Sequence, residues 1–338
     1  MKKINVKDAV GMVLCHDITA INDDFKGALF KRSHVIKECD IDTLLDIGKK
    51  SIYVWEENKD EIHEEDAAHR MAKMIPERGF HYSNVSEGKI SGMSDVDGMF
   101  MVDSDLLGKV NSIKDITVST FLNHYPVKKG MRVFSMRIVP LVTEQKNIEE
   151  MQSLLHGKQL IQILTYSRKR VGVIITGSEV YSGRIKDKFE PVIRKKLSHF
   201  PSDIIGVKIC DDDIDMIQNA ATEFIDKGAD IVIFTGGMSV DPDDLTPTAI
   251  SNLSTDMITK GVPSQPGNMT PLAYKKDTAL IGVPGAAIKS KVTVLDALLP
   301  QLFTGLKLTK QDIINLGEGG LCQFCDECHF PNCTFGKY

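Results

Sequence analysis

The sequence predicts an α/β protein whose main domain is a doubly wound, mainly parallel sheet, preceded by smaller β-rich domains. From Val171 to Gly305, short apolar runs rich in β-branched residues alternate with segments of helical spacing. Strands joined by helical crossovers form parallel sheets, and strands buried on both faces read as continuous apolar runs. The expected strands are VGVIIT, DIIGVKI, DIVIF and TALIGV, and the expected helices are 189–197, 214–227, 245–253 and 288–299.

Composition limits the class of protein. The 338 residues are 42% hydrophobic and 26% charged, which is ordinary for a globular protein of two or three domains. A net charge of −5 and a pI near 6.0 give no sign of nucleic-acid binding. No apolar run is long enough to cross a bilayer, and no signal-peptide core follows Met1, so we expect a cytoplasmic protein.

The first half is predicted to be β-rich. HDITAI and SIYVW have strand character, with a hairpin loop near Asp23 and Asp24, and form a small domain of residues 1–56. A second domain, 57–166, would contain a solvated helix (57–74), strand-like runs (79–144) and a helix (147–166). The α/β domain then spans 167–305, and a Cys-rich tail spans 306–338.

The stretch DIVIFTGGMSVDPDD, residues 230–244, is the centre of the predicted site. A buried strand ends at Gly236 and Gly237, where the absence of side chains lets the backbone approach a ligand. Three aspartates follow before the next helix: Asp241, Asp243 and Asp244. Ligands of open α/β sheets bind beyond the carboxyl ends of the strands, where this loop would lie. An ordinary polar loop is the alternative.

Three further loops after expected strands carry matching features. They are Thr176-Gly177-Ser178-Glu179, Asp211-Asp212-Asp213 and Pro284-Gly285-Ala286-Ala287. The last opens a helix, whose free backbone N–H groups can receive a phosphate. Carboxylates repel a bare phosphate, so Mg²⁺, which binds few carboxylates plus ligand oxygens, is the natural mediator. Helix capping is the alternative role of the three aspartates.

The ordered combination TGSE, GRIKD, DDD, TGGMSVDPDD, QPG and VPG resembles the molybdopterin-binding domain shared by pterin adenylyltransferases and molybdenum insertases of the gephyrin type. The resemblance spans residues 171–305. The segment SDVDGMFMVD, with Asp97 and Gly98, is similar to the MDGYA segment in the N-terminal part of the insertases, and otherwise reads as a tight turn. That second likeness favours the insertase branch.

The resemblance implies an enzyme of molybdenum cofactor biosynthesis, a molybdopterin molybdenumtransferase that uses Mg²⁺ to insert molybdate into adenylated molybdopterin. The implied catalytic residues are Glu179, Asp212, Asp244 and Asp97, the last acting across a homodimer. The implied Mg²⁺ ligands are Asp241 and Asp244. The implied pterin-binding residues are Thr176, Gly177, Ser178, Asp187, Gly236, Gly237, Ser239, Lys260, Pro284 and Gly285. The implied partners are other cofactor-biosynthesis proteins and apo-molybdoenzymes.

The sequence also departs from the family pattern. Gln265 stands where the family has the lysine of KPG, although Lys260 is retained. The usual PGNP turn is PGAAI here, with Lys289 or Lys291 as substitutes for the missing asparagine. The insertase C-terminal β-domain is missing after Gly305. Two rival functions therefore stay open: a non-catalytic molybdopterin carrier or sensor, and a molybdopterin adenylyltransferase.

Four cysteines crowd the tail as Cys322-x2-Cys325-x2-Cys328-His329-x3-Cys333. Such close spacing in a cytoplasmic protein is typical of a metal site rather than a disulfide framework. C-x2-C-x2-C matches the iron–sulfur run except that the fourth spacing is one residue longer, and zinc needs only the same four thiolates. We expect one metal centre here, an iron–sulfur cluster or Zn²⁺; the alternative is a disordered thiol-rich tail.

Overall fold

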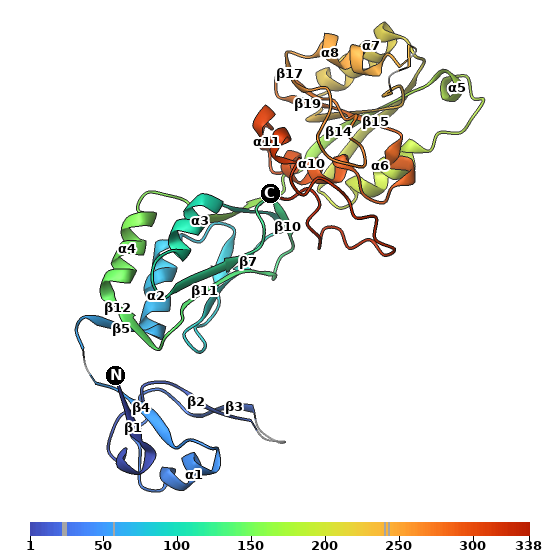
Figure 1. The fold of residues 1–338 in the computed structure, drawn as a ribbon. Helices are drawn as coiled ribbons and strands as arrows, with labels where there is room; N and C mark the ends of the chain where they lie inside the picture. Colours follow the sequence, from blue (N-terminus) through green and yellow to red (C-terminus); the bar gives the residue numbers. More distant parts are fainter. Residues whose placement is uncertain (22–25, 57, 240, 243) are drawn as a thin grey trace. The chain divides into compact units, whose positions relative to one another are not determined.

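The chain folds into two compact units in the computed structural model (Figure 1). The structure describes residues 1–21, 26–56, 58–239, 241–242 and 244–338, so the hairpin loop expected at Asp23 and Asp24 lies outside the described residues. Unit 1 consists of Met1–Asp95, Asp103–Phe121 and Gly130–Gln162. Unit 2 consists of Val96–Val102, Leu122–Lys129 and Ile163–Tyr338. No helix in the described part of the chain is long and apolar enough to cross a membrane.

This division differs from the four consecutive domains expected from the sequence. Two strands that precede residue 130, β8 (Gly98–Val102) and β10 (Tyr125–Val127), share a three-stranded sheet with β13 (Ile161–Thr165) in the order β10-β8-β13. Hydrogen bonding between strands far apart in sequence therefore moves Asp97 and its neighbours into the C-terminal unit.

The first 56 residues of unit 1 form a small β-rich region. Strand β1 (Lys2–Asn5) pairs antiparallel with β4 (Ser51–Val54), and β2 (Ile18–Ile21) pairs with β3 (Lys26–Phe30). The 3₁₀ turn η1 (Val6–Asp8) and helix α1 (Asp40–Asp46) complete the region. They enclose a cluster of buried apolar side chains that includes Val6, Leu14, Ile36, Leu44 and Ile52.

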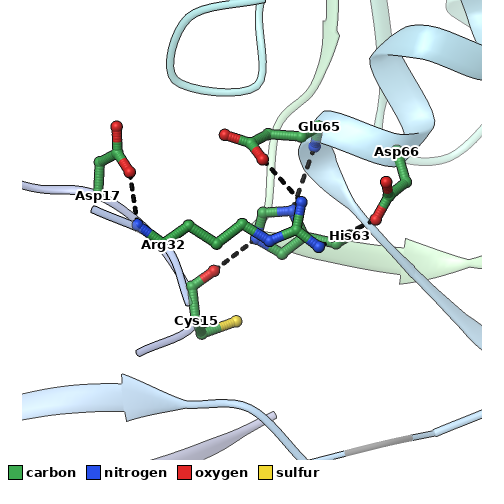
Figure 2. Close-up of polar contacts among 6 residues, drawn as sticks. All are labelled: Cys15, Asp17, Arg32, His63, Glu65 and Asp66. Carbon is green, nitrogen blue, oxygen red and sulfur yellow. Dashed lines mark hydrogen bonds and ion pairs between the residues drawn. The ribbon is translucent and has the colours of Figure 1, made fainter. Parts of the chain in front are cut away.

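Arg32 connects this region to helix α2 (Glu64–Met74), as Figure 2 shows. Its guanidinium donates to the carboxylate of Glu65 at 2.7 Å and to that of Asp66 at 3.0 Å. Close to these contacts in Figure 2, His63 Nε2 lies 2.6 Å from the backbone oxygen of Cys15. The start of α2 is therefore held to the first 56 residues through polar contacts.

The rest of unit 1 is an antiparallel sheet of order β6-β7-β11-β9 with helices packed against it. Its remaining elements are β5 (Glu61–His63), β6 (Phe80–Tyr82), β7 (Ile90–Ser94), α3 (Ser104–Asn111), β9 (Ile116–Thr120), β11 (Arg132–Ile138), β12 (Val142–Glu144) and α4 (Gln145–Leu155). The solvated helix expected over 57–74 is α2, which begins at Glu64 and has one buried face that includes Ala67, Ala68 and Met71. The helix expected over 147–166 ends early, at Leu155.

Unit 2 contains the predicted doubly wound sheet, in the order β15-β14-β16-β19-β18-β17. The strands are β14 (Lys169–Thr176), β15 (Ser202–Cys210), β16 (Ile231–Thr235), β17 (Asp256–Thr259), β18 (Leu272–Lys275) and β19 (Thr278–Val283). The four strands β15, β14, β16 and β19 are parallel, and β18 runs antiparallel to both of its neighbours. The α/β fold class is thereby confirmed.

Helices cover both faces of this sheet. They are α5 (Ser178–Tyr181), α6 (Phe189–Leu197), α7 (Ile214–Asp226), α8 (Thr246–Leu253), α9 (Ala286–Lys289), α10 (Val294–Phe303) and α11 (Lys310–Asn315). Because side chains alternate along a strand, Ile231 and Ile233 of β16 pack in the core that contains α6 and α10. Val232 and Phe234 pack in the core that contains α7 and α8. The single helix expected over 288–299 is instead α9 followed by α10.

The tail belongs to unit 2 rather than forming a separate module. Ile313 of α11 and Phe335 lie in the same core cluster as α10, and Phe335 is 3% exposed. Leu321 forms an isolated parallel bridge with Gln265, and Cys322 N donates to Gln265 O at 2.9 Å. Both ends of the Cys-containing segment are thus attached to the α/β domain.

Candidate ligand-binding edge of the α/β sheet

The carboxyl ends of the four parallel strands meet at one edge of the sheet. In the β-ladder, Thr176 of β14 is aligned with Cys210 of β15, and Thr235 of β16 is aligned with Val283 of β19. The loops that follow these residues contain the residues predicted from sequence to form the site. The structure therefore brings Ser178, Asp212, Gly236 and Pro284 to the same edge.

Ser178 joins the loop after β14 to the loop after β15. Its backbone N–H donates to Asp212 Oδ2 at 2.9 Å, and its hydroxyl donates to Asp211 Oδ1 at 2.6 Å and to Asp212 Oδ2 at 3.1 Å. The hydroxyl of Ser178, followed by the backbone N–H of Asp212, holds the pKa of Asp211 below its usual range. The third aspartate, Asp213, caps α7 by accepting from Met216 N at 2.7 Å, which confirms the capping role for that one residue.

Gly236 and Gly237 lie where side chains would collide with the end of β14. Both have positive φ, 84° and 53°. A Cβ at Gly236 would overlap the backbone oxygen of Thr176, and one at Gly237 would lie 2.8 Å from Thr246 Oγ1. The hydroxyls of Thr176 and Thr246 are themselves 2.9 Å apart. The two glycines are therefore required by packing between loops, in addition to any approach of a ligand.

Asp244 carries an unsatisfied polar atom among the described residues of this edge. Its Oδ2 is buried and has no hydrogen-bond partner among the described residues. Its backbone N–H donates to the backbone oxygen of Asp241 at 3.0 Å, which places the two predicted Mg²⁺ ligands in one turn. A buried carboxylate oxygen without a donor is costly unless a cation or a proton donor reaches it. Asp243 lies outside the described residues.

Glu179, Ser239 and Lys260 are exposed at or near this edge. The carboxylate of Glu179, in α5, approaches Gly177, where an added Cβ would lie 3.3 Å from the Glu179 Oε2 atom. Lys260 follows β17, which runs in the same direction as β19. Among the described residues, no three His, Cys, Asp or Glu side chains are arranged to hold a metal ion.

For two predicted pterin-binding residues, Asp187 and Gly285, the structure shows local features unrelated to a ligand. Asp187 caps α6, accepting from Phe189 N and Glu190 N, both at 2.8 Å. Gly285 has φ of −55°, and a Cβ there would meet nothing within 4 Å, so its own backbone does not require glycine. Helix α9 after it has four residues.

A family model described as "Probable molybdopterin binding domain" matches residues 172–304, the segment that contains every loop of this edge. The chain contains a domain of the molybdopterin-binding family. A second model, a domain of unknown function (DUF8806), matches residues 3–56. The molybdopterin-binding domain is thus preceded by the small β-rich region of unit 1.

Individual relatives of the molybdopterin-binding domain match part of the chain. A CinA-like protein of Mycobacterium avium (strain 104) is 31% identical over 77 residues, which are 23% of this chain and 18% of that protein. The molybdopterin biosynthesis enzyme MoaB of Thermus thermophilus aligns with a TM-score of 0.36 at 23% identity, covering 41% of this chain and 98% of that one. A molybdopterin biosynthesis protein of Mycobacterium abscessus has a TM-score of 0.35, 21% identity and coverages of 44% and 97%.

Asp97 is not brought to the edge of its own molybdopterin-binding domain. It accepts from Lys128 Nζ at 2.8 Å and from Lys129 N at 2.9 Å, and the Lys128 ammonium holds its pKa below the usual range. It lines a cavity of about 530 Å³ with Pro201, next to the first residue of β15. The nine residues of β15 separate this cavity from Asp211 by roughly 30 Å.

Thr246 and Thr235 were not predicted, although both are fully buried at the site. Thr246 is the first residue of α8, and its hydroxyl contacts that of Thr176. The Thr-Pro pair at a predicted helix start was the available signal, because proline favours the first helical turn. It indicated the helix but not the contact with β14.

Proposed function

We propose that this edge of the domain binds adenylated molybdopterin and molybdate, and that the chain is a Mg²⁺-dependent molybdopterin molybdenumtransferase. The observation that carries the proposal is the buried, unpartnered Oδ2 of Asp244 in the loop that follows β16. Such a group needs a cation, and Mg²⁺ joins carboxylates to phosphate or oxyanion ligands. The family match supports a molybdopterin ligand.

The residues present fit a Mg²⁺ ion. Asp244 would supply a carboxylate oxygen, and Asp241, three residues earlier in the same turn, would supply a second or hold a water of the ion. Bound there, the cation would offset the negative charge of the pterin phosphate and of molybdate. Gly236 and Gly237 let the loop after β16 pack closely against Thr176 and Thr246.

The protein's own groups would divide the remaining work. The N–H and hydroxyl of Ser178 fix the carboxylate of Asp212 toward the edge. Exposed Glu179 is free to move a proton to an oxygen that leaves molybdenum. Lys260 would pair with a phosphate oxygen. We further propose a homodimer that acts in the cytoplasm with other cofactor-biosynthesis proteins and apo-molybdoenzymes.

The test is a reaction with adenylated molybdopterin, molybdate and Mg²⁺. We expect AMP release and a product that reconstitutes an apo-molybdoenzyme, both lost in Asp244→Asn. Asp226→Asn is the matched control, because Asp226 is exposed at the C-terminal end of α7, whereas the predicted site lies at the N-terminal end of this helix. Pterin binding without AMP release would show a carrier, and adenylation of molybdopterin from ATP would show an adenylyltransferase; either result overturns the proposal.

A further inference from the structure

The proposed function makes no use of the four tail cysteines, yet all four line one cavity. Its volume is about 340 Å³, and it lies in unit 2 between the segment after α9 and the tail. None of the four thiols is in a disulfide. Cys325 and Cys328 are exposed, whereas Cys322 and Cys333 are half-buried and pack against the core of the α/β domain.

The two half-buried cysteines occupy fixed positions. Cys322 is held by its N–H bond to Gln265 O at 2.9 Å. Cys333 is held by the buried side chain of Lys337, which donates to its backbone oxygen, and by neighbouring Phe335 in the core. The ten residues 323–332 between them are exposed or half-buried. Two ligands are therefore preset and two are carried on an accessible loop.

The first C-x2-C already has a turn suited to a metal-bound thiolate. Phe324 has φ of 52°, a left-handed conformation that is uncommon for a bulky residue. This conformation points its backbone N–H at Cys322 Sγ, 3.5 Å away. Hydrogen bonds from backbone N–H groups to sulfur stabilise thiolates and tune thiolate-bound metals. The strained backbone of Phe324 thus directs an N–H donor at the sulfur of Cys322.

The cavity walls suit a thiolate centre as well. Phe330 and Phe335 contribute apolar surface to its lining. Lys289 and Lys291 line it too, and Lys291 Nζ donates to the backbone oxygen of Asp326 in the loop at 3.5 Å. Four thiolates around a dication carry a net charge of −2, which nearby ammonium groups offset.

We propose that Cys322, Cys325, Cys328 and Cys333 bind one thiophilic metal centre, zinc or an iron–sulfur cluster. The thiols line the cavity without converging within ligating distance in the described residues. Binding therefore requires the exposed loop 323–332 to carry Cys325 and Cys328 inward toward the two fixed cysteines. The site does not depend on the pterin edge, since its ligands come from the tail alone.

The experiment uses the full chain purified without oxygen, followed by metal and acid-labile sulfide analysis. We expect either about one zinc per colourless chain or iron with sulfide and broad visible absorbance. In the double variant Cys325→Ser/Cys328→Ser, the metal content per chain should fall at least tenfold. Because both side chains are exposed, circular dichroism should be unchanged. Cys39→Ser, at an exposed cysteine of unit 1, is the matched control and should keep the metal.

Thiol alkylation gives an independent readout. In the metal-loaded chain the tail thiols should react at least tenfold more slowly than Cys39, and a chelator or acid should abolish that protection. Absence of zinc and iron, full metal content in the double variant, or tail thiols that react as fast as Cys39 would each overturn the proposal.

Discussion

Ser178 binds one carboxylate oxygen of Asp212 twice, through its backbone N–H at 2.9 Å and its hydroxyl at 3.1 Å. The two residues come from loops that follow neighbouring parallel strands. This double contact fixes where the Asp212 charge lies before any ligand arrives, which is the preorganisation that binding sites need.

Replacing Ser178 with Ala removes the hydroxyl but keeps the N–H bond to Asp212. We expect the pKa of Asp211 to rise toward its ordinary value, because the hydroxyl is the main group that lowers it. Molybdopterin affinity should fall on the order of tenfold. Carboxyl-carbon NMR and ligand titration measure the two effects. Ser182→Ala, an exposed serine of the same loop, is the control; equal effects in both variants would contradict a role for the Ser178–Asp212 contact.

Glu179→Gln should separate turnover from binding. The side chain is exposed, so the free energy of unfolding should change by less than about 0.5 kcal/mol. If Glu179 moves a proton during insertion, kcat should fall at least about a hundredfold with little change in pterin affinity. Steady-state kinetics and equilibrium binding give the two values. Wild-type kcat would remove Glu179 from the mechanism.

Gly237→Ala and Gly285→Ala form a matched pair. At Gly237 the new methyl would lie 2.8 Å from Thr246 Oγ1 at φ of 53°, so we expect a loss of about 1–3 kcal/mol in unfolding free energy. At Gly285 the space is open and φ is −55°, so stability should stay within about 0.5 kcal/mol or improve. Denaturant titration tests both. A reversed order would show that the loop contacts of Gly237 are not packed as described.

His124 should make the α/β unit less stable in acid. It is 8% exposed, with its ring centroid 4.3 Å from that of Tyr338, and burial lowers its pKa from 6.5 to about 4. The unfolded chain binds a proton near pH 6.5, which the folded chain does not bind until about pH 4. The contribution of neutral His124 to the free energy of unfolding is therefore fully present above pH 6.5. It declines by roughly 3 kcal/mol as the pH falls to 4.

The measurement is hydrogen exchange of buried strand amides in unit 2 between pH 4 and 7. His124→Asn should show a shallower loss than wild type, since asparagine does not titrate. It also tolerates the left-handed φ of 58° at this position. Parallel pH profiles for the two proteins would assign the acid sensitivity to other groups.

Asp97 should act only across a dimer. Its cavity lies beside Pro201, and the nine residues of β15 separate that cavity from Asp211 of the same chain by roughly 30 Å. Mixing Asp97→Asn with Asp244→Asn protein should restore part of the activity, because some sites would then contain both wild-type residues. Mass spectrometry verifies subunit exchange. No recovery after verified exchange would exclude Asp97 from the site.

The α/β sheet could be predicted because its strands are recognisable one at a time. Val171–Thr176 and Ile231–Phe234 are wholly buried, so nearly every residue in them is apolar. The edge position of Ser178 and Asp212 followed from the rule that ligands meet the carboxyl ends of parallel strands. Boundaries were less accurate where an element is short, as with α9 and α10.

Other features depend on contacts between distant segments, which no local pattern contains. The sheet that β8 and β10 form with β13 places Asp97 in unit 2, although the segments on either side, Met1–Asp95 and Asp103–Phe121, belong to unit 1. The contact between Thr176 and Thr246 joins residues 70 positions apart. The unpartnered oxygen of Asp244 could be identified only from the structure.

The burial of Phe335 in the core beside α10 has a consequence for synthesis on the ribosome. Unit 1 contains no residue beyond Gln162, so its core can close while the α/β domain is still being translated. The core of unit 2 can take up this ring only after residue 335 has left the exit tunnel. The cysteines of the tail therefore emerge just before the last buried ring of that core.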